Sequence, residues 1–193
     1  MRILVIYAHP VKESFVSALH DCVVTTLQKA GHEVDDCDLY AEGFQPVLPR
    51  EERITYHDVS ASRAHVSKEI ERLRLCNGLV LVFPTWWYGM PAILKGYIDR
   101  VWLPGVVFKL DRGRTRPILD NIERFAVVTT YGSPWWLNKL IFDPNRSMLM
   151  RGIRLLFPRV PRARWLAQYG MDAADAGTRE KFLRKVERQL LEL

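Results

Sequence analysis

The feature that most constrains the fold is an uninterrupted apolar run from Leu79 to Phe83. A strand exposed on one face alternates apolar and polar residues, whereas a strand covered on both faces does not. The run therefore predicts a central strand of a parallel sheet, with helices on both sides. Pro84 is predicted to end this strand, because proline has no N–H to donate to a ladder.

Three bulky aromatic residues, Trp86, Trp87 and Tyr88, follow this strand and are interleaved with Gly89 and Pro91. One interpretation is that they are ordinary core side chains. However, their spacing matches neither a helical nor a strand period, and the loop lies where open α/β sheets bind ligands. We therefore favour a rigid wall for a flat ring, with backbone N–H groups turned toward the polar edge of that ring.

A helix is predicted directly after the aromatic loop. Leu94, Tyr97, Ile98 and Val101 are spaced i, i+3, i+4 and i+7, which places them on one apolar face. Pro91 is expected in the first turn of this helix, where its missing N–H would have no intrahelical partner anyway.

The N-terminus predicts a second strand-loop-helix unit. Residues 2–7 form a short apolar run, Ser14 is a plausible N-cap, and the helix is expected to run to about Lys29 and end at Gly31. The loop between them, residues 8–13, contains His9. A helix N-terminus after a short loop favours phosphate, and neither G-x-G-x-x-G nor G-x-x-x-x-G-K-[ST] is present to indicate another phosphate site.

The remaining chain predicts further alternation of strands and helices. Residues 50–62 are polar and irregular, and we predict no regular element there. The expected segments are a strand at 33–39, loops at 40–49 and 103–117, a helix at 63–75, strands at 125–130 and 164–169, an amphipathic stretch to about residue 157 and a final helix at 172–193.

The composition is that of a globular chain, with 48% hydrophobic and 26% charged residues. The length of 193 residues predicts a single domain, residues 1–193. Cys22, Cys37 and Cys76 share no metal-binding spacing and the His residues do not cluster, so we expect buried, reduced thiols and no metal site. No apolar run is long enough for a membrane span, and the first one is too short for a signal peptide, so we expect a cytoplasmic protein.

The chain is basic, with a formal net charge of +6 and a pI near 9.4. Six arginines fall between Arg146 and Arg164. A solvated basic face is the usual meaning of such a run, and attraction of a dinucleotide phosphate, RNA or a membrane surface is the alternative. No nucleic-acid-binding motif is present, so we expect no nucleic-acid partner.

Two stretches carry a family resemblance. The segment FPTWWYGMPAILKGYIDRVW resembles the signature of the flavodoxin-like NAD(P)H:quinone oxidoreductases, the DT-diaphorase and modulator-of-drug-activity group, and ILVIYAHPVKESFVSAL resembles the first strand and flavin-phosphate loop of that family. The resemblance extends over roughly residues 1–130 and is weak beyond them.

The resemblance implies an α/β, flavodoxin-like, doubly wound five-stranded parallel sheet in the order 2-1-3-4-5. It also implies a reductase that transfers a hydride from NAD(P)H, through flavin N5, to quinones or similar flat electrophiles. FAD is the usual cofactor of such proteins and FMN is the alternative. Family members are generally homodimers in which the connection corresponding to residues 103–117 helps to close the pocket, so Phe108 is a pocket candidate.

The resemblance also implies the site residues. Phosphate binding falls to His9, Ser14 and Phe15. Contacts with the flavin ring fall to the two loops at the carboxyl ends of the central strands: Pro84, Thr85, Trp86, Trp87, Tyr88, Thr129, Thr130 and Gly132.

Tyr131 and Tyr88 are the catalytic candidates. Tyr131 stands where the family typically has a glycine. The chain has no His after His65, so the Tyr and His relay of DT-diaphorase is absent, and Tyr131 or a backbone N–H would take its place.

An alternative function is a regulatory flavoprotein that docks on a membrane transporter, resembling the ancillary subunits of potassium-efflux systems. In that case residues 146–164 would form a docking surface. A flavodoxin-like electron carrier fits less well, because such carriers are usually acidic and this chain is basic.

Overall fold

The computed structural model describes residues 1–58, 64–161 and 163–193. Arg63 and Arg162, which belong to the predicted helix at 63–75 and to the basic segment, lie outside this part of the chain. The elements are β1 Arg2–Tyr7, α1 Phe15–Lys29, β2 Glu33–Asp38, α2 Arg50–Ile54, η1 Ala64–Val66, α3 Ser67–Leu75, β3 Gly78–Thr85, α4 Ala92–Val101, β4 Phe108–Asp111, β5 Arg114–Pro117, β6 Arg124–Tyr131, α5 Trp135–Leu140, α6 Pro144–Ser147, η2 Met148–Gly152, η3 Ile153–Leu156, β7 Arg164–Gln168, η4 Met171–Ala173 and α7 Ala176–Leu190.

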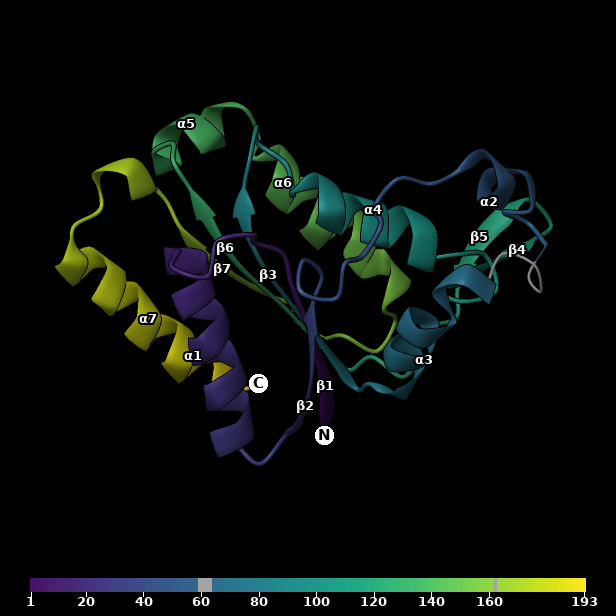
Figure 1. The fold of residues 1–193 in the computed structure, drawn as a ribbon, viewed down its shortest axis with the longest axis horizontal. Helices are drawn as coiled ribbons and strands as arrows, with labels where there is room; N and C mark the ends of the chain where they lie inside the picture. Colours follow the sequence, from purple (N-terminus) through teal and green to yellow (C-terminus); the bar gives the residue numbers. More distant parts are fainter. Residues whose placement is uncertain (59–63, 162) are drawn as a thin grey trace.

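Five parallel strands form the main sheet in the order β2-β1-β3-β6-β7, which confirms the predicted fold class (Figure 1). The chain starts near the middle of the sheet, moves to one edge with β2 and then crosses to the other side with β3. The connection from β1 to β2 and the connection from β3 to β6 therefore run in opposite directions from the carboxyl ends of β1 and β3. Open sheets of this kind leave a crevice at that point.

Helices cover both faces of this sheet. In Figure 1, α1 and α7 lie together on one side and α3 and α4 on the other. Because side chains alternate along a strand, β1 directs Ile3 and Val5 toward α1 and α7, and Leu4 and Ile6 toward α3 and α4. All four side chains are fully buried, as the apolar pattern predicts.

The central strand β3 runs two residues farther than predicted, through Pro84 to Thr85. The Ala8 amide donates to the Val82 carbonyl, so the backbone N–H and C=O of Val82 point toward β1. Backbone groups alternate in direction along a strand, so the backbone of Pro84, two residues farther on, points to the same side. Strand β1 has already ended there. The missing N–H of Pro84 therefore costs no ladder hydrogen bond, and the prediction that proline ends the strand was wrong.

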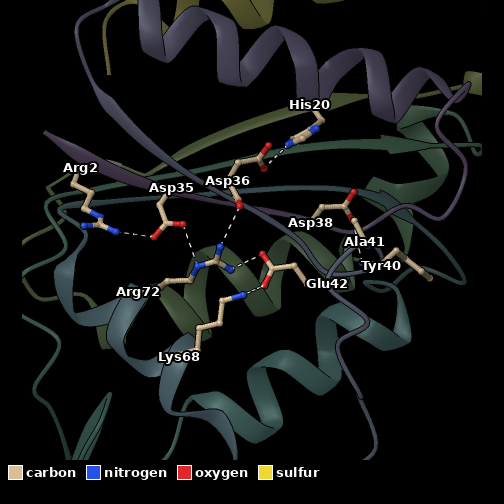
Figure 2. Close-up of polar contacts among 10 residues, drawn as sticks. All are labelled: Arg2, His20, Asp35, Asp36, Asp38, Tyr40, Ala41, Glu42, Lys68 and Arg72. Carbon is tan, nitrogen blue, oxygen red and sulfur yellow. Dashed lines mark hydrogen bonds and ion pairs between the residues drawn. The ribbon is translucent and has the colours of Figure 1, made fainter.

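Strand β2 is an edge strand with three aspartates, and each finds partners within the molecule (Figure 2). Asp35 pairs with Arg2 and Arg72, each at 3.1 Å. Asp36 accepts from the His20 ring at 2.7 Å, and Asp38 accepts from the Tyr40 and Ala41 amides, each at 3.0 Å. Arg72 also binds Glu42 at 2.7 Å, and Lys68 binds the same carboxylate at 2.6 Å. We call this set the aspartate strand.

Two regions predicted to be irregular contain regular elements. Residues 50–54 form α2, because the Arg100 guanidinium on α4 holds Glu52 in a buried ion pair. Residues 108–117 form the hairpin β4–β5, whose two-residue turn has both Arg112 and Gly113 at positive φ.

Smaller corrections concern helix starts. The final helix begins at Ala176 rather than at residue 172, because the Asp175 carboxylate accepts the Thr178 amide at 2.7 Å and so acts as the N-cap. Pro91 is the N-cap of α4 rather than a residue of its first turn.

No helix among the described residues combines the length and apolar character needed to cross a bilayer. Within the same residues, no three His, Cys, Asp or Glu side chains are grouped as a metal site would require. Cys37 and Cys76 are buried free thiols, as expected, whereas the free thiol Cys22 is only half-buried. Burial raises the pKa of both Cys37 and Cys76 to about 12.

Candidate functional site

The loops after β1 and β3 meet at the carboxyl edge of the sheet. Tyr7, the last residue of β1, pairs in register with Val82, and β3 continues three residues farther to Thr85. The His9 and Trp86 rings are 5.9 Å apart between centroids. The predicted phosphate loop and the aromatic turn are therefore neighbours, although they are far apart in the sequence.

Nδ1 of His9 is held by the backbone of Val11. It lies 3.0 Å from the Val11 amide nitrogen and 3.1 Å from the Val11 carbonyl oxygen, so the tautomer decides whether it accepts from the first or donates to the second. In the tautomer that accepts at Nδ1, the hydrogen is on Nε2. No partner for Nε2 is recorded among the described residues, so in that tautomer Nε2 can donate to an anion beside the loop.

Ser14 is the N-cap of α1, as predicted: its hydroxyl accepts the Ser17 amide at 3.1 Å. The first turn contains no acidic side chain to offset the positive end of the helix dipole. Phe15 is half-buried and packs against the core between α1 and the sheet. Thus Ser14 and the helix end can serve an anion, while the ring of Phe15 holds the helix in place.

The aromatic turn has an unusual backbone. Trp86 and Gly89 exchange two backbone hydrogen bonds of 3.0 Å, and the residues between them have φ of 51° (Trp87) and 60° (Tyr88). Two positive φ values in a two-residue turn define type I′, which normally contains Asn and Gly. Bulky side chains there cost about 1–3 kcal/mol each, and such strain is concentrated at functional sites.

The aromatic side chains of this turn are not core residues. Trp87 is 98% exposed, Trp86 42% and Tyr88 37%. Burial in the core would explain the presence of three aromatic residues without any ligand, but none of the three side chains is buried. The wall interpretation therefore agrees with the exposure of all three rings.

Two adjacent cavities lie beside the turn, of about 530 and about 270 Å³. Thr85, Trp87 and Gly132 line both. The larger also has walls of Pro84, Trp86, Thr130, Met171 and Asp172, and the smaller of Tyr88, Tyr131 and Ser133. The structure thus gathers the predicted ring-binding residues around one composite groove.

Thr129 lies behind this groove rather than in its wall. It is fully buried, and its hydroxyl is 3.0 Å from that of Thr85. The Asn145 amide nitrogen donates to the same Thr85 hydroxyl at 2.9 Å. The Asn145 side-chain oxygen is buried and has no hydrogen-bond partner within the described residues. Thr129 and Asn145 together fix the position of Thr85.

The hydroxyl of Tyr131 is already bonded within the protein. Tyr131 is buried, donates to Asp143 at 2.7 Å and stacks on Tyr169 at 4.6 Å between centroids. Burial, with the hydrogen bond to and the charge of Asp143, raises its pKa. Tyr169 donates to the other Asp143 oxygen at 3.0 Å, and burial with that charge raises its pKa to about 12. Both phenols keep their protons at neutral pH.

Gly132 makes room for an acidic side chain. A Cβ at this position would lie 2.7 Å from Oδ2 of Asp172, so a larger residue would push this exposed carboxylate aside. The backbone of Gly132 consequently remains open on the cavity side, where it lines both cavities.

Phe108 is not brought to this edge. It lines a separate cavity of about 420 Å³, together with Tyr56, Ile98 and Trp102 among others, and none of the aromatic-turn residues. Within the described residues of this one chain, the hairpin does not help to form the groove.

Several residues of the site region were not predicted, among them Asp143, Asn145, Met171 and Asp172. The last two follow β7, and a loop after the last parallel strand necessarily reaches the same edge of the sheet, so their place was predictable. Asp143 is the N-cap and Asn145 a residue of the four-residue helix α6, which is too short for a periodic pattern, and no sequence signal marked their part in the site.

Comparison with known proteins was consistent with this geometry. A family model described as "Flavodoxin-like fold" matches residues 1–189. An uncharacterised NAD(P)H oxidoreductase of Haemophilus influenzae is 33% identical over 130 residues, 67% of this chain and 64% of that protein. NAD(P)H dehydrogenase [quinone] 1 of Rattus norvegicus is 29% identical over 148 residues, 68% of this chain and 54% of that protein. Across the curated relatives, the matches span about half the length of the relative.

Among solved structures, the NAD(P)H:quinone oxidoreductase of Methanothermobacter marburgensis superposes with a TM-score of 0.86 at 27% identity, covering 99% of this chain and 98% of that one. The structural match therefore extends over the C-terminal third, where the sequence resemblance is weak. With its strand order and nearly full-length family match, the chain belongs to the family of proteins with the flavodoxin-like fold.

Proposed function

We propose that this chain is an NAD(P)H-dependent flavoprotein reductase acting on quinones or similar flat electrophiles. The observation that carries the proposal is the strained, exposed aromatic turn beside a groove and next to an anion-binding loop. A protein that only folds has no use for an exposed indole at positive φ. The names of the quinone oxidoreductases among the relatives support the same activity.

The residues fit a flavin. The groove offers an apolar wall and open backbone at Gly132, which suits a flat ring with polar edges. When bound, the flavin supplies hydride acceptance and donation. Its ring would contact Pro84, Thr85, Trp86, Trp87, Tyr88, Thr130 and Gly132, with Thr129 behind them.

The phosphate end would contact His9, Ser14 and the start of α1. Both FAD and FMN carry the phosphate that this loop would hold. We propose FAD, the usual cofactor in the resembling family, with FMN as the alternative. Two structural relatives bound to FMN keep that alternative open, although their low identity supports only the fold.

Tyr88 and Tyr131 are the proposed proton-handling residues. The Tyr88 hydroxyl has no recorded partner within the described residues and lies on the smaller cavity. It can donate to a substrate oxygen. Tyr131 would act through Asp143, which holds its hydroxyl, rather than as a free acid.

We further propose one flavodoxin-like domain over residues 1–193, a homodimer and a cytoplasmic location. The single domain is supported by β7 and α7, which come from the end of the chain and complete the sheet and one of its layers. The exposed Trp135, Trp136 and Leu140 beside the groove suit a second copy. The transporter-docking alternative has no support in the relatives named above, none of which is described as a transporter subunit.

The decisive experiment is a visible spectrum of the purified protein after incubation with FAD or FMN and desalting, then again after anaerobic addition of NADPH. We expect a retained flavin band that bleaches on reduction, and quinone addition should restore it. A retained band that stays oxidised with both NADPH and NADH would overturn the reductase proposal. Loss of the band with both flavins would overturn flavin binding itself.

A further inference from the structure

Another cavity, of about 360 Å³, lies on the segment after β6, and of its lining residues only Asp143 has a part in the function proposed above. It is built by α5, α6 and η2. Its charged walls are Lys139, Arg146 and Arg151, and the rest of its lining is Phe142, Asp143, Ser147 and Met150. We call it the basic pocket.

The three cations of the basic pocket have no anionic partner in the part of the chain that the structure describes. Among the described residues, no ion pair is recorded for Lys139, Arg146 or Arg151. All three side chains are exposed, and Lys139 contacts only the ring of Trp135 as a cation–π pair. Three like charges around one cavity repel one another, and an anion in the cavity would remove that repulsion.

The single carboxylate in the pocket does not neutralise them. Asp143 directs Oδ1 to the Tyr131 hydroxyl and Oδ2 to the Tyr169 hydroxyl, at 2.7 and 3.0 Å. The Arg146 amide also approaches Oδ1, at 3.3 Å. The carboxylate is thus held by its own hydrogen bonds, and the cations outnumber it.

The shape of the pocket is fixed by local structure. Phe142 and Asp143 both have positive φ, 62° and 41°. Their backbone is held by the Asp143 amide, which donates to the Asn138 carbonyl at 2.7 Å, and by the Ser147 hydroxyl, which donates to the Phe142 carbonyl at 2.8 Å. This conformation leaves the Phe142 ring 85% exposed at the rim. A strained, preformed cavity with an exposed ring is typical of a binding site.

The basic pocket adjoins the groove through shared residues. Asp143 lines the pocket and bonds to Tyr131, which lines the smaller cavity of the groove. Two residues farther along, Asn145 bonds to Thr85, which lines both cavities of the groove. A long ligand that has one end in the groove can therefore place its other end in the basic pocket.

We propose that the basic pocket binds the adenosine 2′-phosphate of the dinucleotide co-substrate and so gives the protein a preference for the 2′-phosphorylated form. This inference rests on the proposed reductase function. Arginine guanidinium groups recognise phosphate by paired hydrogen bonds, and Phe142 offers its ring to the purine. The dinucleotide with the additional phosphate gains most from three unpaired cations.

The first test needs neither flavin nor turnover. Calorimetric titration should show adenosine 2′,5′-bisphosphate binding at least tenfold more tightly than adenosine 5′-monophosphate. Arg146→Gln and Arg151→Gln should each abolish most of that difference. Arg188→Gln, which changes an equally exposed arginine in the last turn of α7, should leave it unchanged. Equal affinity for both nucleotides, or an equal loss in all three variants, would overturn the inference.

A second test separates this inference from the reductase proposal. In the flavin-loaded protein, Arg146→Gln should raise KM for NADPH about tenfold, with little change in KM for NADH or in kcat. An unchanged NADPH-to-NADH ratio in an active enzyme would refute the basic pocket while leaving the reductase intact. Loss of retained flavin in Arg146→Gln would instead assign the pocket to the cofactor and also refute the inference.

Discussion

The aspartate strand and the basic pocket are both crowded with charge, yet they differ in how that charge is balanced. On β2, every aspartate has a partner within the chain, and the single side chain of Arg72 forms ion pairs with both Asp35 and Glu42. In the basic pocket, three cations have no ion-pair partner among the described residues. The first cluster is electrostatically complete, and the second is not.

The comparison separates two roles for residues that are locally unfavourable. Three aspartates in a strand and two bulky residues in a type I′ turn both contradict local preference. Where other residues of the protein pair with the unfavourable side chains, as they do with the aspartates of β2, those side chains serve stability. Where the strain or the charge is not offset by neighbouring residues, as at Trp87 and in the basic pocket, we interpret it as the mark of a ligand site.

The largest effect on folding should follow from breaking the complete cluster. Arg72→Gln removes the ion pairs to Asp35 and Glu42, and should lower the free energy of unfolding by about 2–3 kcal/mol. Chemical denaturation measures it. Arg184→Gln is the matched control, because its pair with Glu180 is exposed on both sides and should be worth less than about 0.5 kcal/mol. Equal losses in the two variants would contradict the comparison.

An effect of opposite sign is expected at the aromatic turn. Trp87→Asn should raise the free energy of unfolding by about 1 kcal/mol, because asparagine tolerates positive φ and the exposed indole loses no packing. The same variant should lose flavin on desalting. Val47→Asn, at another highly exposed position whose φ is not positive, should show no such gain. A destabilised Trp87→Asn would mean that the indole contributes to the fold.

The dependence of stability on pH should sharpen the comparison further. Burial alone would raise the pKa of Glu42, but the hydrogen bonds from Lys68 and Arg72 outweigh it, so the pKa lies below its ordinary value of 4.5. The stability that the ionised Glu42 carboxylate contributes is therefore complete above pH 4.5, and it is lost as the pH falls through the pKa of Glu42 in the folded protein. Thermal unfolding from about pH 6 to about pH 3 should show a smaller decline in Glu42→Gln than in the native chain. Identical declines would show that Glu42 is not held as a carboxylate.

The smallest effect should be found in the incomplete cluster. Arg146→Gln and Arg151→Gln should change the free energy of unfolding by less than about 0.5 kcal/mol, since neither side chain has an ion pair among the residues that the structure describes. Thermal unfolding without nucleotide checks this. A clear loss of stability in either variant would mean that the arginine serves the fold.

Much of the fold could be predicted because its signals are local. The apolar runs of β1 and β3, the cap at Ser14 and the inward face of α7 each lie within one segment of the chain. Helix α2 could not be predicted, because Glu52 is buried only through Arg100, which is 48 positions away. A polar sequence gives no indication of such a distant partner.

The site divides in the same way. The aromatic residues and the loop containing His9 could be predicted, because motif and position in the topology agree. Their exposure and positive φ could not, since these depend on how the turn closes. Asp143 and Asn145 could not either, because they act through hydrogen bonds to residues of β3 and β6. Which element an irregular segment contacts is decided by tertiary packing.

The pairs of positive-φ residues at Trp87–Tyr88 and Phe142–Asp143 also matter for any attempt to make this protein more heat-resistant. A consensus or computational redesign scored on stability alone would replace Trp87, Tyr88 and Phe142 first, with asparagine or glycine, whereas Asp143 is kept by its hydrogen bonds to Tyr131 and Tyr169. Each of these three replacements would look like an improvement in a melting curve. Together they would remove the ring beside the groove and the rim of the basic pocket, so a thermostable library should hold these four positions constant.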